Sequence, residues 1–214
     1  MSTTTTPRIR LALVGLSSSA KSAWASTAHL PYLLSPAGQS KYQIVALLNS
    51  SIAAARKSIK TYNLPASTRA YGDPAALAAD KEVDLVVNTT RVDKHYETVL
   101  DSVKAGKDVY VEWPLAHDAK HARELAEAGR EAGGRSVVGL QGGRAPVVKR
   151  LRELLAEGRI GKVLSSELRA FGGSADREVF PEGLEYWTKR AIGGNFHTIA
   201  FAHCESRLCC CCCC

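Results

Sequence analysis

The chain has 214 residues, of which 45% are hydrophobic and 23% charged, with a formal net charge of +7. This balance is that of an ordinary globular protein, and no apolar run approaches the ~20 residues that a membrane-spanning helix needs. The excess of Lys and Arg is scattered rather than clustered, which argues against direct nucleic-acid binding.

From residue 8 onward, apolar strands alternate with amphipathic helices. The expected strands cover residues 9–14, 42–48, 70–71, 83–88, 109–111 and 136–140. The expected helices cover residues 19–30, 52–62, a segment that begins at 73–74, 94–105 and 119–132. Strands that are apolar on both faces and alternate with helices indicate a parallel sheet covered on two sides. The sequence therefore predicts a doubly wound α/β domain over residues 8–140.

The pattern changes after residue 140. A basic amphipathic helix is expected over residues 147–157 and an alternating strand over residues 163–171, before a charged loop and an apolar segment at residues 196–202. One strand and one or two helices are too few to close a core of their own. We therefore expect residues 141–208 to be the start of an incomplete second α/β domain.

The two ends of the chain are unusual. Six of the seven cysteines stand together at residues 209–214, and the rest of the chain contains only Cys204. A disulfide framework needs spaced cysteines, and a body nearly free of cysteine is typical of a reducing compartment. We interpret residues 209–214 as the anomalous end of a truncated or frame-shifted reading frame, and residues 1–7 as a disordered tail without a signal-peptide pattern. We expect a cytoplasmic protein, or one of cytoplasm and nucleus, without a metal site.

The first motif follows the first strand. Gly15 is placed as in the glycine-rich turn of a dinucleotide-binding fold, and Ser17 and Ala20 stand at the second and third small-residue positions. The hydroxyls of Ser17 and Ser18, together with the N–H groups of a helix N-terminus, can hold a phosphate. Because only one of three glycines is present, a plain strand–turn–helix without a ligand is an equal alternative.

The second motif follows the second strand. Asn49 and Ser50, with Ser51, stand where an NAD-binding fold usually has an acid for the ribose hydroxyls. Arg56 and Lys57 follow in the next helix, an arrangement that tolerates a 2′-phosphate. The sequence therefore favours NADP over NAD, unless these two cations are simply exposed helix residues.

Two further strand ends have polar residues. Thr89, Thr90 and His95 follow the strand at 83–88 and can line a cofactor cleft, although His95 alone is better explained as a structural histidine at a helix end. Glu112 and Trp113 follow the strand at 109–111. Ligands in open parallel sheets lie just beyond the carboxyl ends of strands, so both positions are candidates for contact with a ligand.

Together these segments resemble the Gfo/Idh/MocA family of glucose-fructose oxidoreductases and inositol dehydrogenases, over about residues 8–206. The segments that show the resemblance are residues 14–17, 86–90 with His95, 105–116, 139–144, 160–163 and 193–203. The resemblance implies an N-terminal Rossmann domain, a C-terminal α/β domain with a large sheet, and hydride transfer between NAD(P) and a sugar or polyol. It also implies that Gly15, Ser17 and Ser18 hold the pyrophosphate and that Glu112 contacts the nicotinamide ribose.

Two departures from the family pattern bear on catalysis. The family has a lysine where this chain has Trp113, and an indole cannot act as a general acid or base, although it can stack on a nicotinamide or a sugar. The family also has an aspartate four residues before a catalytic histidine, where this chain has Ile199. His203 is then the remaining candidate base, or a buried structural histidine.

With the serine-rich turn after the first strand, the tryptophan and the missing aspartate, the chain resembles the branch of fungal galactose-regulon repressors more closely. That resemblance implies a regulator that binds a dinucleotide and a transcriptional activator protein and catalyses nothing. Three hypotheses follow: an oxidoreductase acting on a sugar-like substrate, a dinucleotide-sensing regulator, and a truncated product that does neither and exposes an apolar face.

Overall fold

The computed structural model describes residues 7–20, 23–167, 169, 182–195, 198–199 and 201–203. The chain divides into two compact units, Met1–Val138 and Gly139–Cys214. Each unit is described by itself below.

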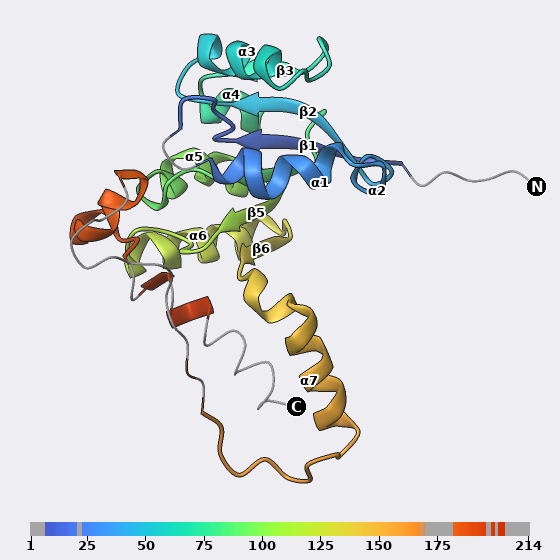
Figure 1. Ribbon diagram of the computed structural model, residues 1–214. Coiled ribbons are helices and arrows are strands. Elements are labelled where there is room, and N and C mark those ends of the chain that lie inside the picture. Colours follow the sequence, from blue (N-terminus) through green and yellow to red (C-terminus); the bar gives the residue numbers. More distant parts are fainter. Residues whose placement is uncertain are drawn as a thin grey trace, which may run out of the picture. The chain divides into compact units, whose positions relative to one another are not determined.

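The first unit is built on a six-stranded sheet with the order β3-β2-β1-β4-β5-β6 (Figure 1). The strands are β1 (Ile9–Val14), β2 (Tyr42–Leu48), β3 (Arg69–Tyr71), β4 (Leu85–Asn88), β5 (Asp108–Glu112) and β6 (Ser136–Gly139). The first five strands pair in parallel. The chain runs outward from β1 to β3 and then returns to the other side of β1, so the predicted doubly wound fold is confirmed.

Helices connect the strands. They are a π-helical segment η1 (Ala25–His29), α1 (Leu30–Leu34), α2 (Pro36–Gln39), α3 (Ile52–Thr61), α4 (Pro74–Ala78), α5 (Val92–Lys104) and α6 (Ala119–Ala132). The side chains of Ser51, Asp73 and Asp118 accept hydrogen bonds from backbone N–H groups at the starts of α3, α4 and α6. Such N-caps satisfy donors that have no partner within the helix, which fixes where each helix begins.

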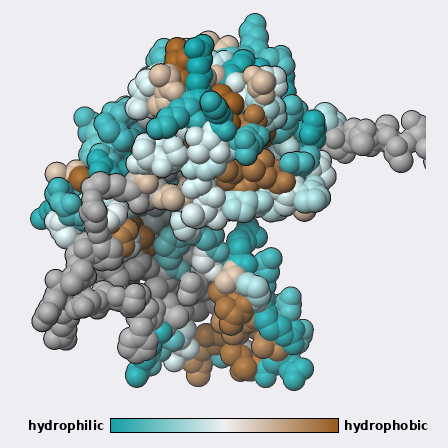
Figure 2. Space-filling model, turned by 45° about the horizontal axis from the view of Figure 1, so that its top comes forward, coloured by the Kyte–Doolittle hydropathy of each residue, from teal (hydrophilic) through white to brown (hydrophobic). Residues whose placement is uncertain are grey.

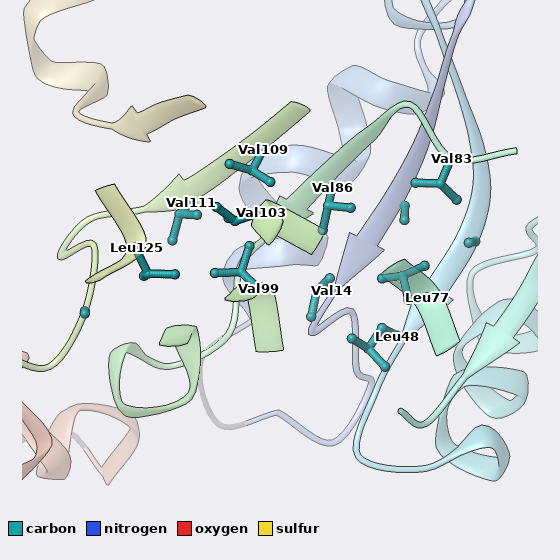
Figure 3. Close-up of a cluster of buried hydrophobic side chains, with 13 residues drawn as sticks. Val14, Leu48, Leu77, Val83, Val86, Val99, Val103, Val109, Val111 and Leu125 are labelled. Atoms are coloured by element: carbon teal, nitrogen blue, oxygen red, sulfur yellow. The ribbon is translucent and has the colours of Figure 1, made fainter. Parts of the chain in front are cut away.

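Hydrophobic cores lie on both faces of the sheet. Alternate residues of β1 point to opposite faces, so Val14 joins one core and Leu13 the other. The first core packs the sheet against α4, α5 and α6, and Figure 3 shows Val86, Val99 and Leu125 among its side chains. The second packs the sheet against α1 and α3. Burial on two faces explains why the strands have no polar side.

The helix predicted from residue 19 begins later than expected. Ser17 Oγ accepts a hydrogen bond from Ser19 N at 3.2 Å and lies 3.1 Å from Ser19 Oγ. Local side-chain bonds of this kind compete with helix formation, and η1 begins only at Ala25. Ala20 is consequently exposed in the loop. The prediction that Ala20 packs between helix and strand was wrong.

The second unit contains η2 (Gln141–Arg144), α7 (Pro146–Ala156), η3 (Glu182–Thr188) and η4 (Arg190–Ile192). The strand predicted at 163–171 is not present over residues 163–167, and residues 168, 170 and 171 of that prediction lie outside the described residues. Hydrophobic side chains gather along α7 (Figure 2), where Val147 is 73% exposed. In the described part of the chain, no helix is long and apolar enough to cross a membrane.

Candidate functional site

A cavity of about 680 Å³ opens at the carboxyl ends of β1, β2 and β4. It is lined by Val14, Gly15, Ser17, Ser19, Leu48, Asn49, Ser50, Ala54, Gly72, Pro74, Thr90, Lys94, Glu97 and Thr98. This is the point where the strand order reverses, and ligands of open α/β sheets bind in that crevice. Five of the residues singled out from the sequence therefore share one cavity: Gly15, Ser17, Asn49, Ser50 and Thr90.

Gly15 brings two loops close together at the base of this cavity. Its φ of +95° lies in the left-handed region, where a side chain causes strain. A Cβ atom on Gly15 would lie 2.9 Å from Thr90 Cγ2 and 3.1 Å from Thr90 N. Only glycine therefore allows the turn after β1 to approach the loop after β4 this closely.

Asn88 organises the loop after β4. It is fully buried, and its Oδ1 accepts hydrogen bonds from Thr90 N at 3.1 Å and from Thr90 Oγ1 at 2.7 Å. Its Nδ2 donates to Thr98 Oγ1 at 2.8 Å. Thr89 donates its hydroxyl to Val14 O at 2.7 Å and is not among the cavity-lining residues. Asn88 was not predicted as a site residue, although a polar side chain at the end of a buried apolar strand is a usable signal.

Asn49 connects the end of β2 to the first turn. Its Nδ2 donates to Leu16 O at 2.8 Å and to Ser58 Oγ at 3.2 Å. Its Oδ1 is buried and has no hydrogen-bond partner. A buried acceptor without a donor costs free energy, so this atom is a place where a ligand hydroxyl or a water would be stabilising. Ser50 is exposed beside it.

The two cations of α3 point in different directions. Ala54 lines the cavity, and Lys57, three residues later, lies on the same side of the helix. Arg56 lines a separate hollow of about 600 Å³ with Arg69 and Tyr71. The structure thus places Arg56 away from the cavity to which it was assigned. Both cations are exposed.

A third cation, not predicted from the sequence, lines the cavity itself. Lys94 pairs with Glu97 across 3.0 Å on α5, and the side chains of both are more than half exposed. Among the cavity-lining residues, Lys94 is the one with a positive charge.

His95 lies behind the cavity rather than on its surface. It is 1% exposed, with Nδ1 2.8 Å from Pro114 O and Nε2 2.8 Å from Thr90 O. Burial lowers the pKa of His95, which favours the neutral ring. A neutral ring donates through one nitrogen only. A neutral His95 can therefore donate to only one of the two carbonyls, and its buried ring packs between the loops after β4 and β5, as a structural histidine at a helix end would.

Glu112 is engaged by a residue that is distant in the sequence. It is 9% exposed at the end of β5, and its Oε1 lies 2.5 Å from His29 Nε2. Tyr110 donates its hydroxyl to the same oxygen at 3.3 Å, and burial raises the pKa of Tyr110, which keeps it a donor. The rings of His29 and Tyr110 meet edge to face, with centroids 5.6 Å apart. No sequence spacing links positions 29 and 112, so His29 was missed.

The remaining predicted residues lie outside the cavity lining. Trp113 is half-buried next to Glu112 and precedes Pro114 through a cis peptide bond. Ser18 is exposed in the loop after β1. His203 and Ile199 are half-buried in helical residues of the second unit.

The sequence matches two family models. Residues 9–140 match the oxidoreductase family with an NAD-binding Rossmann fold, and residues 146–213 match the C-terminal domain of Gal80p. Dehydrogenase aclE of Aspergillus oryzae is 37% identical over 161 residues, which are 75% of this chain and 43% of that protein. The galactose/lactose metabolism regulatory protein GAL80 of Saccharomyces cerevisiae is 29% identical over 201 residues, 91% of this chain and 45% of that protein.

Comparison of folds agrees with the sequence matches. The crystal structure of a super-repressor mutant of Gal80p from Saccharomyces cerevisiae superimposes with a TM-score of 0.65 and 29% identity, over 73% of this chain and 40% of that one. The chain spans less than half the length of these relatives. The oxidoreductase family model covers residues 9–140, which are more than half of the chain and contain the sheet and the cavity. The chain therefore belongs to the Gfo/Idh/MocA oxidoreductase family, near its Gal80-like branch.

Proposed function

We propose that the chain binds an NAD(P) dinucleotide in the cavity at the ends of β1, β2 and β4. The observation that supports this most strongly is that Gly15, Ser17, Asn49, Ser50 and Thr90 line one cavity, at which Gly15 lets the turn after β1 approach the loop after β4. The buried acceptor of Asn49 is a second feature that suits a hydroxyl-bearing ligand. In this proposal, the adenosine lies among Leu48, Ala54 and Pro74, which provide apolar contacts.

The phosphates would lie at the turn after β1. Ser17 and Ser18 offer hydroxyls there, and Thr90 offers its side chain from the loop after β4. Lys94 lines the same cavity beside Glu97, with which it pairs, and its ammonium group could reach a phosphate if it left that carboxylate. We propose NADP rather than NAD, since Asn49 and Ser50 replace the usual acid and Lys57 lies on the cavity's side of α3.

The bound nicotinamide would supply the hydride acceptor or donor. In the oxidoreductase proposal, similarity to proteins named inositol 2-dehydrogenase/D-chiro-inositol 3-dehydrogenase and 1,5-anhydro-D-fructose reductase suggests a sugar or polyol-like substrate. Glu112 would orient the nicotinamide ribose, Trp113 would stack on the nicotinamide or the substrate, and His203 would accept the proton of the reacting hydroxyl. Thr89 and His95 would act behind the cavity, by fixing the loop that includes Thr90.

A second candidate function is a dinucleotide-sensing regulator that binds an activator protein. It rests on the absence of a titratable group at Trp113 and Ile199, together with the similarity to GAL80. The expected location, the cytoplasm alone or the cytoplasm and nucleus, suits either function.

Cofactor binding is tested by titrating the chain with NADPH and with NADH while nicotinamide fluorescence is recorded. We expect saturable binding that Gly15→Val abolishes and Gly133→Val preserves, because a Cβ at Gly133 meets nothing within 4 Å. Equal, unsaturable signals in all three proteins would contradict the proposal.

The two functions are separated by turnover, measured on a version extended to the length of the relatives. Reduction of NADP with a panel of sugars and polyols, lost in His203→Ala, would support the oxidoreductase. Tight NADPH binding without turnover on any substrate would support the regulator.

A further inference from the structure

Three side chains with metal-ligating chemistry meet at the start of α6, outside the cavity described above. His117, Asp118 and His121 each offer one ligand atom, and these atoms all lie within 4.8 Å of one another. No residue of this His-Asp-His cluster takes part in the proposed dinucleotide site.

The ligand atoms of the cluster are separated by distances close to those between ligand atoms around a bound metal ion. His117 Nε2 lies 3.1 Å from Asp118 Oδ2, and His121 Nδ1 lies 2.8 Å from Asp118 Oδ1. The two imidazole rings are 4.4 Å apart between centroids and tilted by 37°. Ligand atoms around a tetrahedral ion at ~2.0–2.2 Å stand roughly 3.4 Å from each other. Small side-chain rotations would therefore bring all three onto one ion.

The local fold fixes these groups before any ion arrives. Asp118 is the N-cap of α6, and its Oδ1 accepts a hydrogen bond from His121 N at 2.8 Å. The ring of Tyr96 meets His121 edge to face at 4.4 Å, and its hydroxyl donates to Glu124 at 2.6 Å. Both imidazoles remain 27–29% exposed, so the cluster is accessible from solvent.

The ring of His117 is oriented toward the cluster. Its Nε2 faces the carboxylate of Asp118, whereas its Nδ1 is buried and has no hydrogen-bond partner. The positive end of the α6 dipole opposes a bound cation, and the carboxylate of Asp118 offsets that cost at the same place. A hydrogen-bonded helix cap without a metal is the alternative explanation.

We propose that His117, Asp118 and His121 form a binding site for a divalent transition-metal ion of the Zn²⁺ type, with water in the fourth position. Imidazole nitrogens suit Zn²⁺, Cu²⁺ and Ni²⁺. Mg²⁺ and Ca²⁺ prefer oxygen ligands, and the cluster offers one carboxylate only. The site is therefore selective for transition metals over the abundant alkaline-earth ions.

The test must first remove the thiols, because cysteine thiolates bind Zn²⁺ tightly. The protein used for the test has Cys204→Ser and the same Cys→Ser replacement at each of residues 209–214. Isothermal titration of this protein with Zn²⁺ should give about one ion per chain with micromolar affinity, and Mg²⁺ should give no signal. His117→Gln and His121→Gln should each weaken Zn²⁺ binding by at least about ten-fold.

Two further variants serve as controls, one for folding of the helix start and one for the loss of a histidine outside the cluster. Asp118→Asn preserves a good N-cap but removes the anionic ligand, so it should weaken Zn²⁺ binding while the far-ultraviolet circular dichroism stays unchanged. His203→Gln removes a histidine of the second unit and should leave Zn²⁺ binding as it is. Absence of Zn²⁺ binding at millimolar concentration, or equal binding in the His117 and His121 variants, would overturn the proposal.

Discussion

Replacement of Gly15 by alanine should destabilise the protein through two separable effects. A non-glycine residue in the left-handed region costs about 1–2 kcal/mol, and Gly15 has a φ of +95°. The new Cβ would also lie 2.9 Å from Thr90 Cγ2 and 3.1 Å from Thr90 N. Because Thr90 N is held by Asn88, the loop cannot withdraw freely, and overpacking of this kind costs about 1–3 kcal/mol. We expect a total loss of about 2–5 kcal/mol in the free energy of unfolding.

Gly133→Ala is the matched control for this experiment. Gly133 ends α6 with a φ of +75°, and a Cβ there meets nothing within 4 Å. It should lose only the backbone contribution of about 1–2 kcal/mol. The measurement is urea unfolding followed by circular dichroism, with similar m-values required for all three proteins. Equal losses for Gly15→Ala and Gly133→Ala would refute the close-approach argument.

Three other substitutions test the remaining features of the first unit. Lys57→Ala should weaken NADPH binding several-fold while leaving NADH binding unchanged. Arg56→Ala, on the other side of α3, should change the affinity for neither cofactor. Equal effects of the two substitutions on NADPH binding would contradict the assignment of Lys57 to the 2′-phosphate. His29→Leu removes the shorter of the two described hydrogen bonds to the buried carboxylate of Glu112 and leaves the one from Tyr110. It should cost about 1–3 kcal/mol of unfolding free energy in urea; a neutral result would show that the pair is unimportant. The Arg10 guanidinium lowers the pKa of Asp84 below its usual 3.8, so the stabilisation is present above that value and is lost as the pH falls through the lowered pKa. Acid unfolding of Arg10→Met should therefore depend less on pH below about 4 than that of the unmodified chain.

The sheet could be predicted from the sequence because its signals are local. β1 and β2 have the predicted bounds, since each is a continuous apolar run, and α6 begins at the residue that its N-cap Asp118 marks. The start of η1 was misjudged because serine hydroxyls in the preceding loop form bonds with each other instead of capping a helix. The strand at 163–171 was predicted from alternation alone, and over residues 163–167 the structure has no strand.

The candidate site was predictable only in part, for a similar reason. Gly15 and Thr90 could be found because each follows an apolar strand, and parallel strands end at the same edge of the sheet. Arg56 and Lys57 have the same local signal, and only their positions on α3 separate them. The contact between His29 and Glu112 depends on how η1 packs against β5, which no pattern of neighbouring residues encodes.

The proposed role of Glu112 has to be compatible with its existing partners. Both of its described hydrogen bonds, from His29 and Tyr110, involve Oε1. An ionised carboxylate has further acceptor sites on its second oxygen, so Oε2 can accept from a ribose hydroxyl while Oε1 keeps its partners. The pairing would then orient the carboxylate before a cofactor binds, which reduces the conformational entropy lost on binding. This function needs no proton transfer, and it is therefore equally useful to a dehydrogenase and to a regulator in which Trp113 has replaced the family lysine.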